Sequence, residues 1–160
     1  MESSPVHAAY LPFAQTLRAG GFSEPAEGWN ASQVGAHISM SNELFSELAD
    51  QIHAGGEASF DNAAVSDRDA LLRHATSHGD LAGLADAIEA SARRLEQAYG
   101  RLSADERDRP VPTRIWHEGR IVRDSPMSIG ELILGNGDFH LAMHTEQLHA
   151  LLSDTAPAEQ

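Results

Sequence analysis

Apolar residues recur along most of this chain at the three- and four-residue spacings that are typical of an amphipathic helix. Residues 29–52 show the pattern most clearly. With helical residues turning by about 100° each, one stripe of this segment holds Val34, His37, Ser41, Leu44, Phe45, Leu48 and Ile52. An earlier helix is predicted over residues 5–19, with an interruption near Pro12. Both segments are therefore expected to turn one face toward a core.

The second half of the chain predicts further helices. Residues 68–102 keep the helical period, either as one helix or as two that break at Gly79, after a capping pattern that begins at Ser66. The last helix is predicted over residues 128–152. Its stripe holds Ile129, Ile133, His140, Met143, His144, Gln147, Leu148 and Leu151. Four main helices predict an all-α fold, a four-helix bundle.

The connection that precedes the last helix has a different pattern. A polar stretch with two prolines is predicted to be a loop. Residues 114–124 then predict a small β-hairpin that turns at Glu118–Gly119. We expect residues 1–160 to form a single domain, with the polar residues 153–160 as a frayed tail.

Charge and composition limit the classes of partner. The chain has 24 acidic and 11 basic side chains, which gives a formal net charge of −13. This charge repels phosphate backbones and anionic lipids, so neither nucleic acid nor a membrane is an expected partner. No signal peptide or apolar span is apparent in the sequence, and a cytoplasmic location is expected. The chain has no cysteine, so a thiol in its chemistry would have to come from a cosubstrate.

Two histidines in the last helix suggest a metal site. His140 and His144 are four residues apart, so their rings project from one face of the helix at successive turns. Burying both rings without partners would cost about 1–3 kcal/mol for each unsatisfied group. The spacing leaves two interpretations open, which are a pair of metal ligands and a pair of hydrogen-bonded rings in the interior. A metalloprotease is excluded, because no glutamate follows His140 to act as general base.

Other histidines help to choose between these interpretations. His74 and His78 have the same spacing, but their polar surroundings predict a solvated face that does not bind metal. His37 lies on the apolar stripe of another helix, between Val34 and Leu44. Three histidines from two helices would form an open tetrahedral site, with a fourth position left for water or substrate.

Two segments resemble the DinB-like family, which includes damage-inducible proteins, thiol S-transferases and mycothiol-dependent maleylpyruvate isomerases. In "WNASQVGAHI", Trp29 and Asn30 open a helix and His37 follows. "HLAMHTEQL" resembles the closing His-x-x-x-His-x-x-Gln-Leu pattern, from His140 to Leu148. The resemblance extends over nearly the whole chain and is most specific in the spacing of the three histidines.

The resemblance implies a bundle with up-down-down-up topology in which His37, His140 and His144 hold zinc or nickel. It also implies a low-molecular-weight thiol cosubstrate, such as mycothiol, bacillithiol or glutathione. The isomerase branch tends to carry glutamate and aspartate where this chain has His140 and Gln147. This departure argues against maleylpyruvate as the substrate.

Arginines near the predicted hairpin are candidates for binding an anionic group of a small-molecule substrate. Arg114, Arg120 and Arg123 flank the hairpin, and Trp116 and His117 lie beside them. A solvated arginine face would give the same pattern.

Three functions fit these observations. The first is a metal-dependent enzyme that uses an external thiol, as an S-transferase or as a thiol-dependent isomerase. The second is a hydrolase or lyase that uses metal-bound hydroxide. The third is a non-catalytic bundle that binds a small molecule or forms a homodimer.

Overall fold

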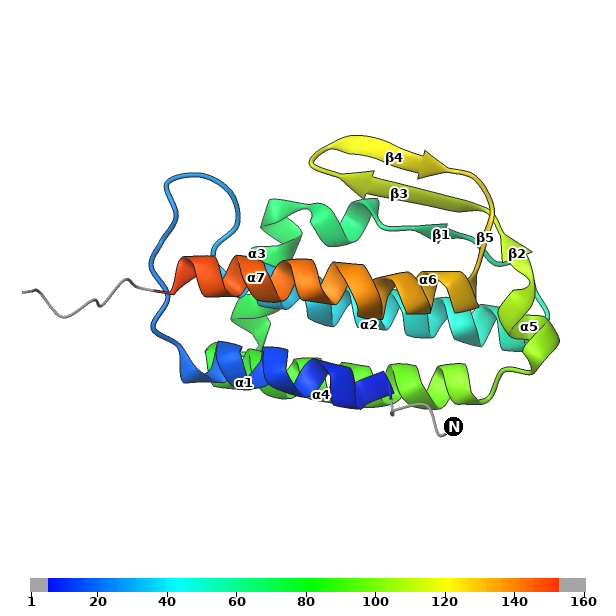
Figure 1. Ribbon diagram of the computed structural model, residues 1–160, viewed down its shortest axis with the longest axis horizontal. Helices are drawn as coiled ribbons and strands as arrows, with labels where there is room; N and C mark the ends of the chain where they lie inside the picture. Colours follow the sequence, from blue (N-terminus) through cyan, green and yellow to red (C-terminus); the bar gives the residue numbers. More distant parts are fainter. Residues whose placement is uncertain (1–5, 153–160) are drawn as a thin grey trace, which may run out of the picture.

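The computed structural model describes residues 6–152, and the predicted frayed tail, residues 153–160, lies outside the described residues. Figure 1 shows long helices that run side by side, with a β-hairpin over one side of them. The α-helices are α1 (Leu11–Ala19), α2 (Ala31–His53), α3 (Arg68–Ser77), α4 (Leu81–Gly100), α5 (Ala104–Asp108), α6 (Ile129–Gly135) and α7 (Leu141–Leu151). The 3-10 turns η1 (Val6–Tyr10) and η2 (Ala63–Ser66) precede α1 and α3, and a π-helical segment, η3 (Asn136–His140), joins α6 to α7.

Strands correct the predicted fold class. β1 (Phe60–Asp61), β3 (Thr113–His117) and β4 (Arg120–Asp124) form one sheet, with β1 parallel and β4 antiparallel to β3. β2 (Pro110–Val111) pairs with β5 (Met127–Ser128) in a second sheet. The prediction of an all-α four-helix bundle is therefore wrong, because helices and two small sheets share this chain. Strands of two residues are too short to show an alternating pattern, so β1, β2 and β5 could not be predicted from the sequence.

The hairpin itself lies where the sequence indicated. β3 and β4 are joined at Glu118 and Gly119, which have φ values of 49° and 76°. A two-residue turn with positive φ at both positions matches the right-handed twist of its strands. Every residue of β4 is exposed, so this strand adds no apolar face to the core.

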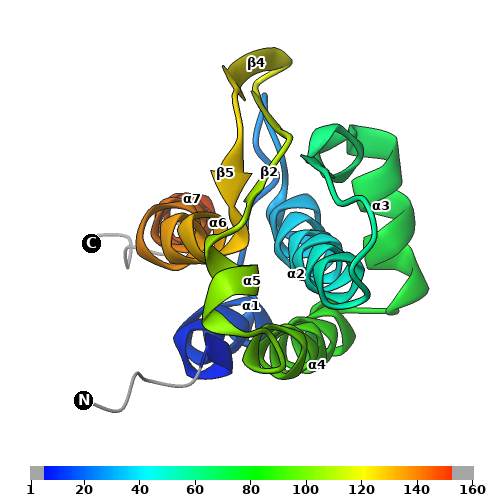
Figure 2. The ribbon, with the colours of Figure 1, turned by 90° about the vertical axis from the view of Figure 1, so that its right-hand side faces the viewer.

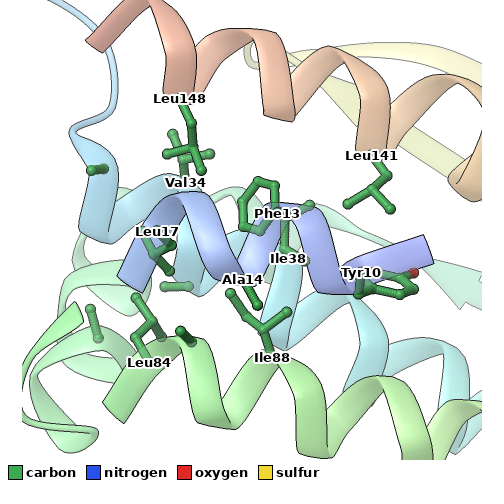
Figure 3. Packing of buried hydrophobic residues seen from close by; sticks show 14 of the residues in the cluster. Tyr10, Phe13, Ala14, Leu17, Val34, Ile38, Leu84, Ile88, Leu141 and Leu148 are labelled. Atoms are coloured by element: carbon green, nitrogen blue, oxygen red, sulfur yellow. The ribbon is translucent and has the colours of Figure 1, made fainter. Parts of the chain in front are cut away.

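Helices from both ends of the chain build the core. In the end-on view of Figure 2, α1, α2, α4 and the α6–α7 helix surround a common interior, and α3 lies on the outer side of α2. Figure 3 shows how side chains from α1, α2, α4 and α7 meet there. The labelled core residues include Phe13, Leu17, Val34, Ile38, Leu84, Ile88, Leu141 and Leu148.

A glycine allows α2 to approach its neighbours closely. A Cβ atom at Gly35 would lie 2.8 Å from side-chain carbons of both Leu17 and Leu84. A larger residue at this position would push α1 and α4 away from α2. Gly35 therefore fixes the separation of the helices directly before His37.

Several helix boundaries differ from the predicted ones. The region predicted as one or two helices is two, because α3 ends at Ser77 and α4 begins after Asp80 caps the amide of Gly83. The cap of α3 is Asp67, whereas Ser66 ends a 3-10 turn. The predicted proline-containing loop includes the short helix α5 and the strand β2. Within residues 6–152, no helix has both the length and the apolar content needed to cross a bilayer.

Candidate metal centre

Three histidines converge on one point of the interior, as the sequence predicted. The Nε2 atom of His140 lies 2.8 Å from that of His37 and 3.0 Å from that of His144. His37 comes from α2, His140 ends the π-helical segment, and His144 lies on α7. Among the described residues, these three form a group whose ligand atoms all lie within 4.8 Å of one another. They are close enough to bind a single metal ion.

Each ring is oriented by a hydrogen bond on its other nitrogen. The Nδ1–H of His37 donates to the carbonyl of Val65 at 2.6 Å. The rings of His140 and His144 donate from Nδ1 to the side-chain oxygens of Asn136 and Gln147, both at 2.8 Å. A neutral imidazole that donates from Nδ1 has a lone pair on Nε2. All three lone pairs therefore point to the centre, which is the second-shell arrangement of histidine metal ligands.

Burial keeps these rings neutral. It lowers the pKa of His37 from its ordinary 6.5 to about 4, with a further contribution from the charge of His144. It also lowers the pKa of His140 to about 2, and that of His144 below its usual value. Three neutral rings with facing lone pairs repel one another at these distances, and no ring has a hydrogen to share on Nε2. A cation at their centre would convert this repulsion into three bonds, so the residues fit a metal.

The start of α2 fixes one wall of the centre. Asn30 and Gln33 form a capping box, in which the side chain of each accepts a hydrogen bond from the backbone of the other at 2.9 Å. Trp29 directly precedes the cap, and its ring centroid lies 5.0 Å from that of His37 and 6.1 Å from that of His144. The Trp-Asn pair noted in the sequence thus begins the helix and covers the rings.

The π-helical segment fixes the opposite wall. The amide of Leu141 donates to the carbonyl of Asn136, five residues earlier. This wider turn places both Asn136 and the later residues Leu141 and His144 on the buried side. The side-chain nitrogen of Asn136 donates to the buried hydroxyl of Tyr10. This orientation leaves the side-chain oxygen of Asn136 to accept the hydrogen bond from His140. Neither Asn136 nor Val65 was predicted from the sequence to orient a metal ligand.

A cleft of about 1060 Å³ leads to the three rings. Its walls come from the start of α2, from η2 and α3, from the β3–β4 hairpin and from α7. The residues of the hairpin that line it are Ile115, Trp116, His117, Glu118, Gly119 and Val122. Trp116 and His117, which the sequence analysis named beside the candidate arginines, belong to this lining.

Asn62 holds the hairpin over the cleft. Its side-chain oxygen accepts from the backbone amide of Trp116 at 2.6 Å, and its side-chain nitrogen donates to the Trp116 carbonyl at 3.2 Å. The paired bonds continue the short parallel ladder in which Phe60 and Asp61 lie beside Thr113 and Arg114. This clamp was also not apparent from the sequence, because an asparagine after a two-residue strand has no distinguishing pattern.

The three predicted arginines lie away from the centre. Arg114 forms an ion pair of 3.5 Å with Asp124 across the hairpin, and the described lining of the cleft includes neither Arg120 nor Arg123. All three are exposed, as expected of a solvated arginine face. Arg68, at the start of α3, lines the cleft instead.

The second histidine pair is partly exposed, as predicted. The rings of His74 and His78 are 4.8 Å apart between centroids, and Nε2 of His74 lies 3.0 Å from the hydroxyl of Ser39. Among residues 6–152, no third ligand joins them in a metal-sized group.

Comparison of the chain with protein-family models, with curated proteins and with solved structures gave no match.

Proposed function

We propose that this protein is a metal-dependent enzyme that uses a low-molecular-weight thiol of the mycothiol type, as an S-transferase or thiol-dependent isomerase acting on an electrophilic small molecule. The observation that carries the proposal is the convergence of three Nε2 lone pairs on one point at the end of a cleft. Structural zinc sites are usually closed by four protein ligands, whereas three ligands leave a position for a reactant.

The surroundings of the centre suit this chemistry. His37, His140 and His144 would hold the ion as neutral ligands, and their hydrogen-bond acceptors are a carbonyl and two amides, which are also neutral. Zinc and nickel both accept imidazole ligands. When bound, the ion supplies a positive charge that lowers the pKa of a coordinated thiol.

The thiol would come from solution, because the chain has no cysteine of its own. The cleft of about 1060 Å³ is slightly larger than the usual small-molecule site. It therefore has room for a thiol and an electrophile together. The resemblance to thiol-using DinB-like proteins, carried by Trp29, Asn30 and the three histidines, supports the same choice.

His117 is the residue that we expect to carry the thiol proton from the centre to solvent. The rings of the metal ligands are occupied on Nδ1 by fixed hydrogen bonds, so they cannot take a proton there. His117 lines the cleft from the hairpin and is exposed.

Cobalt substitution tests the proposal. Adding mycothiol or glutathione to the Co²⁺ protein should produce a sulfur-to-cobalt charge-transfer band and release about one proton per site. His144→Ala should lose the band together with the metal, whereas His78→Ala, in the partly exposed pair, should keep it. If no thiol changes the spectrum at millimolar concentration, the thiol-dependent function is wrong. Hydrolysis with metal-bound hydroxide, or binding without catalysis, would then be the better account.

A further inference from the structure

A second, smaller pocket of about 340 Å³ opens beside the metal centre. It lies between α2, the β3 strand, and the α6–η3–α7 helix. Four residues line both this pocket and the main cleft: Asn62, Ile115, His140 and Met143. Because His140 belongs to both linings, a molecule in the cleft can extend into the smaller pocket while it remains next to the centre.

The small pocket is lined mainly by apolar side chains. These are Phe45, Phe60, Ile115, Met127, Leu132, Phe139 and Met143. Phe45 and Phe60 stack with their planes 9° apart and their centroids 5.0 Å apart, which holds two aromatic rings in a fixed orientation at the pocket. An aromatic and aliphatic lining of this kind suits an apolar ring.

Three polar residues of this pocket already have hydrogen-bond partners, and Ser41 adds a neutral hydroxyl to the lining. The carboxylate of Glu131 accepts from the backbone amide of Ser128 at 2.8 Å, within a capping box at the start of α6. Asn62 binds the backbone of Trp116, and Asn136 binds Tyr10 and His140. The described lining of the pocket includes no lysine or arginine, so an anionic ligand would lose its hydration there without compensation.

The surface at the pocket is also apolar. Phe139 and Met143 line it and are 77% and 41% exposed, which is unusual for side chains of their size. A protein of net charge −13 has little reason to expose them beside its reactive centre unless an apolar molecule contacts them there.

We propose that the electrophilic substrate carries a neutral, ring-sized apolar group that occupies this pocket, with its reactive carbon on the His140 side. The inference rests on the proposed function and adds the substrate class to it. The main cleft, which also contains Arg68 and His117, then receives the polar thiol. The two pockets thus assign the two reactants to different sides of His140.

Two glycines allow a matched test. Gly135 lines the small pocket, has an ordinary helical φ of −62°, and a Cβ atom there would meet nothing within 4 Å. Gly135→Leu should therefore fill space at the pocket without straining the backbone. Gly137 is equally unobstructed but is not among the lining residues, so Gly137→Leu is the control. Thermal unfolding of both variants checks that they keep the fold.

The experiment is a titration of 4-fluorotoluene followed by ¹⁹F NMR, on the metal-free and the Co²⁺-loaded protein. The wild-type protein should bind the probe, and Gly135→Leu should weaken binding by at least about tenfold, while Gly137→Leu should not. In the Co²⁺ protein, the bound fluorine should relax faster, because the pocket adjoins the centre.

The outcomes separate this inference from the proposed function. Absence of binding to the wild-type protein, or equal binding to Gly135→Leu, would overturn the pocket assignment even if the cobalt–thiol band is present. Probe binding that Gly135→Leu weakens, in a protein that takes up no Co²⁺, would support an apolar ligand site and reject the thiol-dependent enzyme. Binding without relaxation by cobalt would overturn the placement of the ring beside His140.

Discussion

The Nε2 atoms of His37 and His140 lie 2.8 Å apart, although neither ring has a hydrogen there to donate to the other. Both rings donate instead from Nδ1, to the carbonyl of Val65 and to the side chain of Asn136. Two lone pairs at this distance are favourable only around a cation. This pairing, completed by His144, is the strongest indication of metal chemistry in the molecule.

Metal affinity should depend on the residues that orient the rings. Gln147→Ala removes the acceptor for Nδ1 of His144 and should weaken Zn²⁺ or Ni²⁺ binding by about 10–100-fold. Competition with a chelating dye measures this change. His74→Ala is the control and should leave the affinity unchanged. Equal affinity of the wild-type protein and Gln147→Ala would show that the hydrogen bond does not orient a ligand.

The metal-free protein should lose stability as the pH falls below about 6.5. Burial lowers the pKa of His37 from 6.5 in the unfolded chain to about 4 in the folded state. Between these two pH values, the unfolded chain binds a proton that the folded protein does not, so protonation stabilises the unfolded state relative to the folded one. From this residue alone, the free energy of unfolding should be about 2 kcal/mol lower at pH 5 than at pH 7.5.

Urea unfolding at the two pH values checks this expectation. His37→Leu removes the titrating ring and should reduce the dependence on pH, whereas His149→Ala, at an exposed position, should not. A dependence on pH that is the same in His37→Leu and in the wild-type protein would assign the effect to other groups.

Trp29 should report metal binding directly. Its ring is stacked near His144, with planes 15° apart, and lies close to His37. Trp116→Phe leaves Trp29 as the remaining tryptophan of the two in the chain. Adding Ni²⁺ or Co²⁺ to this variant should quench its fluorescence until the site is saturated. Fluorescence that stays constant while calorimetry shows binding would place the ion elsewhere.

The hairpin should become more mobile when its clamp is removed. Asn62→Ala deletes two hydrogen bonds to the backbone of Trp116, and hydrogen exchange at the Trp116 amide should accelerate by about tenfold. Asp61→Ala is the matched control, since it removes a turn hydrogen bond to Ala63 and leaves Trp116 untouched. Equal exchange in the two variants would mean that other contacts hold the hairpin.

The sequence predicted the histidine centre because helical periodicity is regular over most of the chain. His37 lies three residues after the buried Val34, and His144 four residues before the buried Leu148, so all four occupy the interior. The period places these residues correctly even without knowledge of how the helices are connected. His74 and His78 were predicted to lie outside the site because their neighbours in the sequence are polar.

The last helix shows where periodicity fails. A continuous α-helix would turn Leu141 by about 140° from Asn136, but both are buried, because the π-helical turn brings residues five apart nearly into line. The uninterrupted stripe therefore placed Met143 in the core, whereas it is 41% exposed at the two pockets. The short strands and Arg68 were missed for a related reason. Their positions follow from contacts between distant segments and not from a local pattern.

His37 and His140 are separated by 103 positions along the chain. The unfolded chain scatters these ligands, so an ion would bind the folded state far more tightly than the unfolded one. At a free metal concentration a thousandfold above the dissociation constant, this preference is worth about 4 kcal/mol of stability. The supply of metal in the cell would then govern how long each molecule survives proteolysis, and chains that never receive an ion would be removed first.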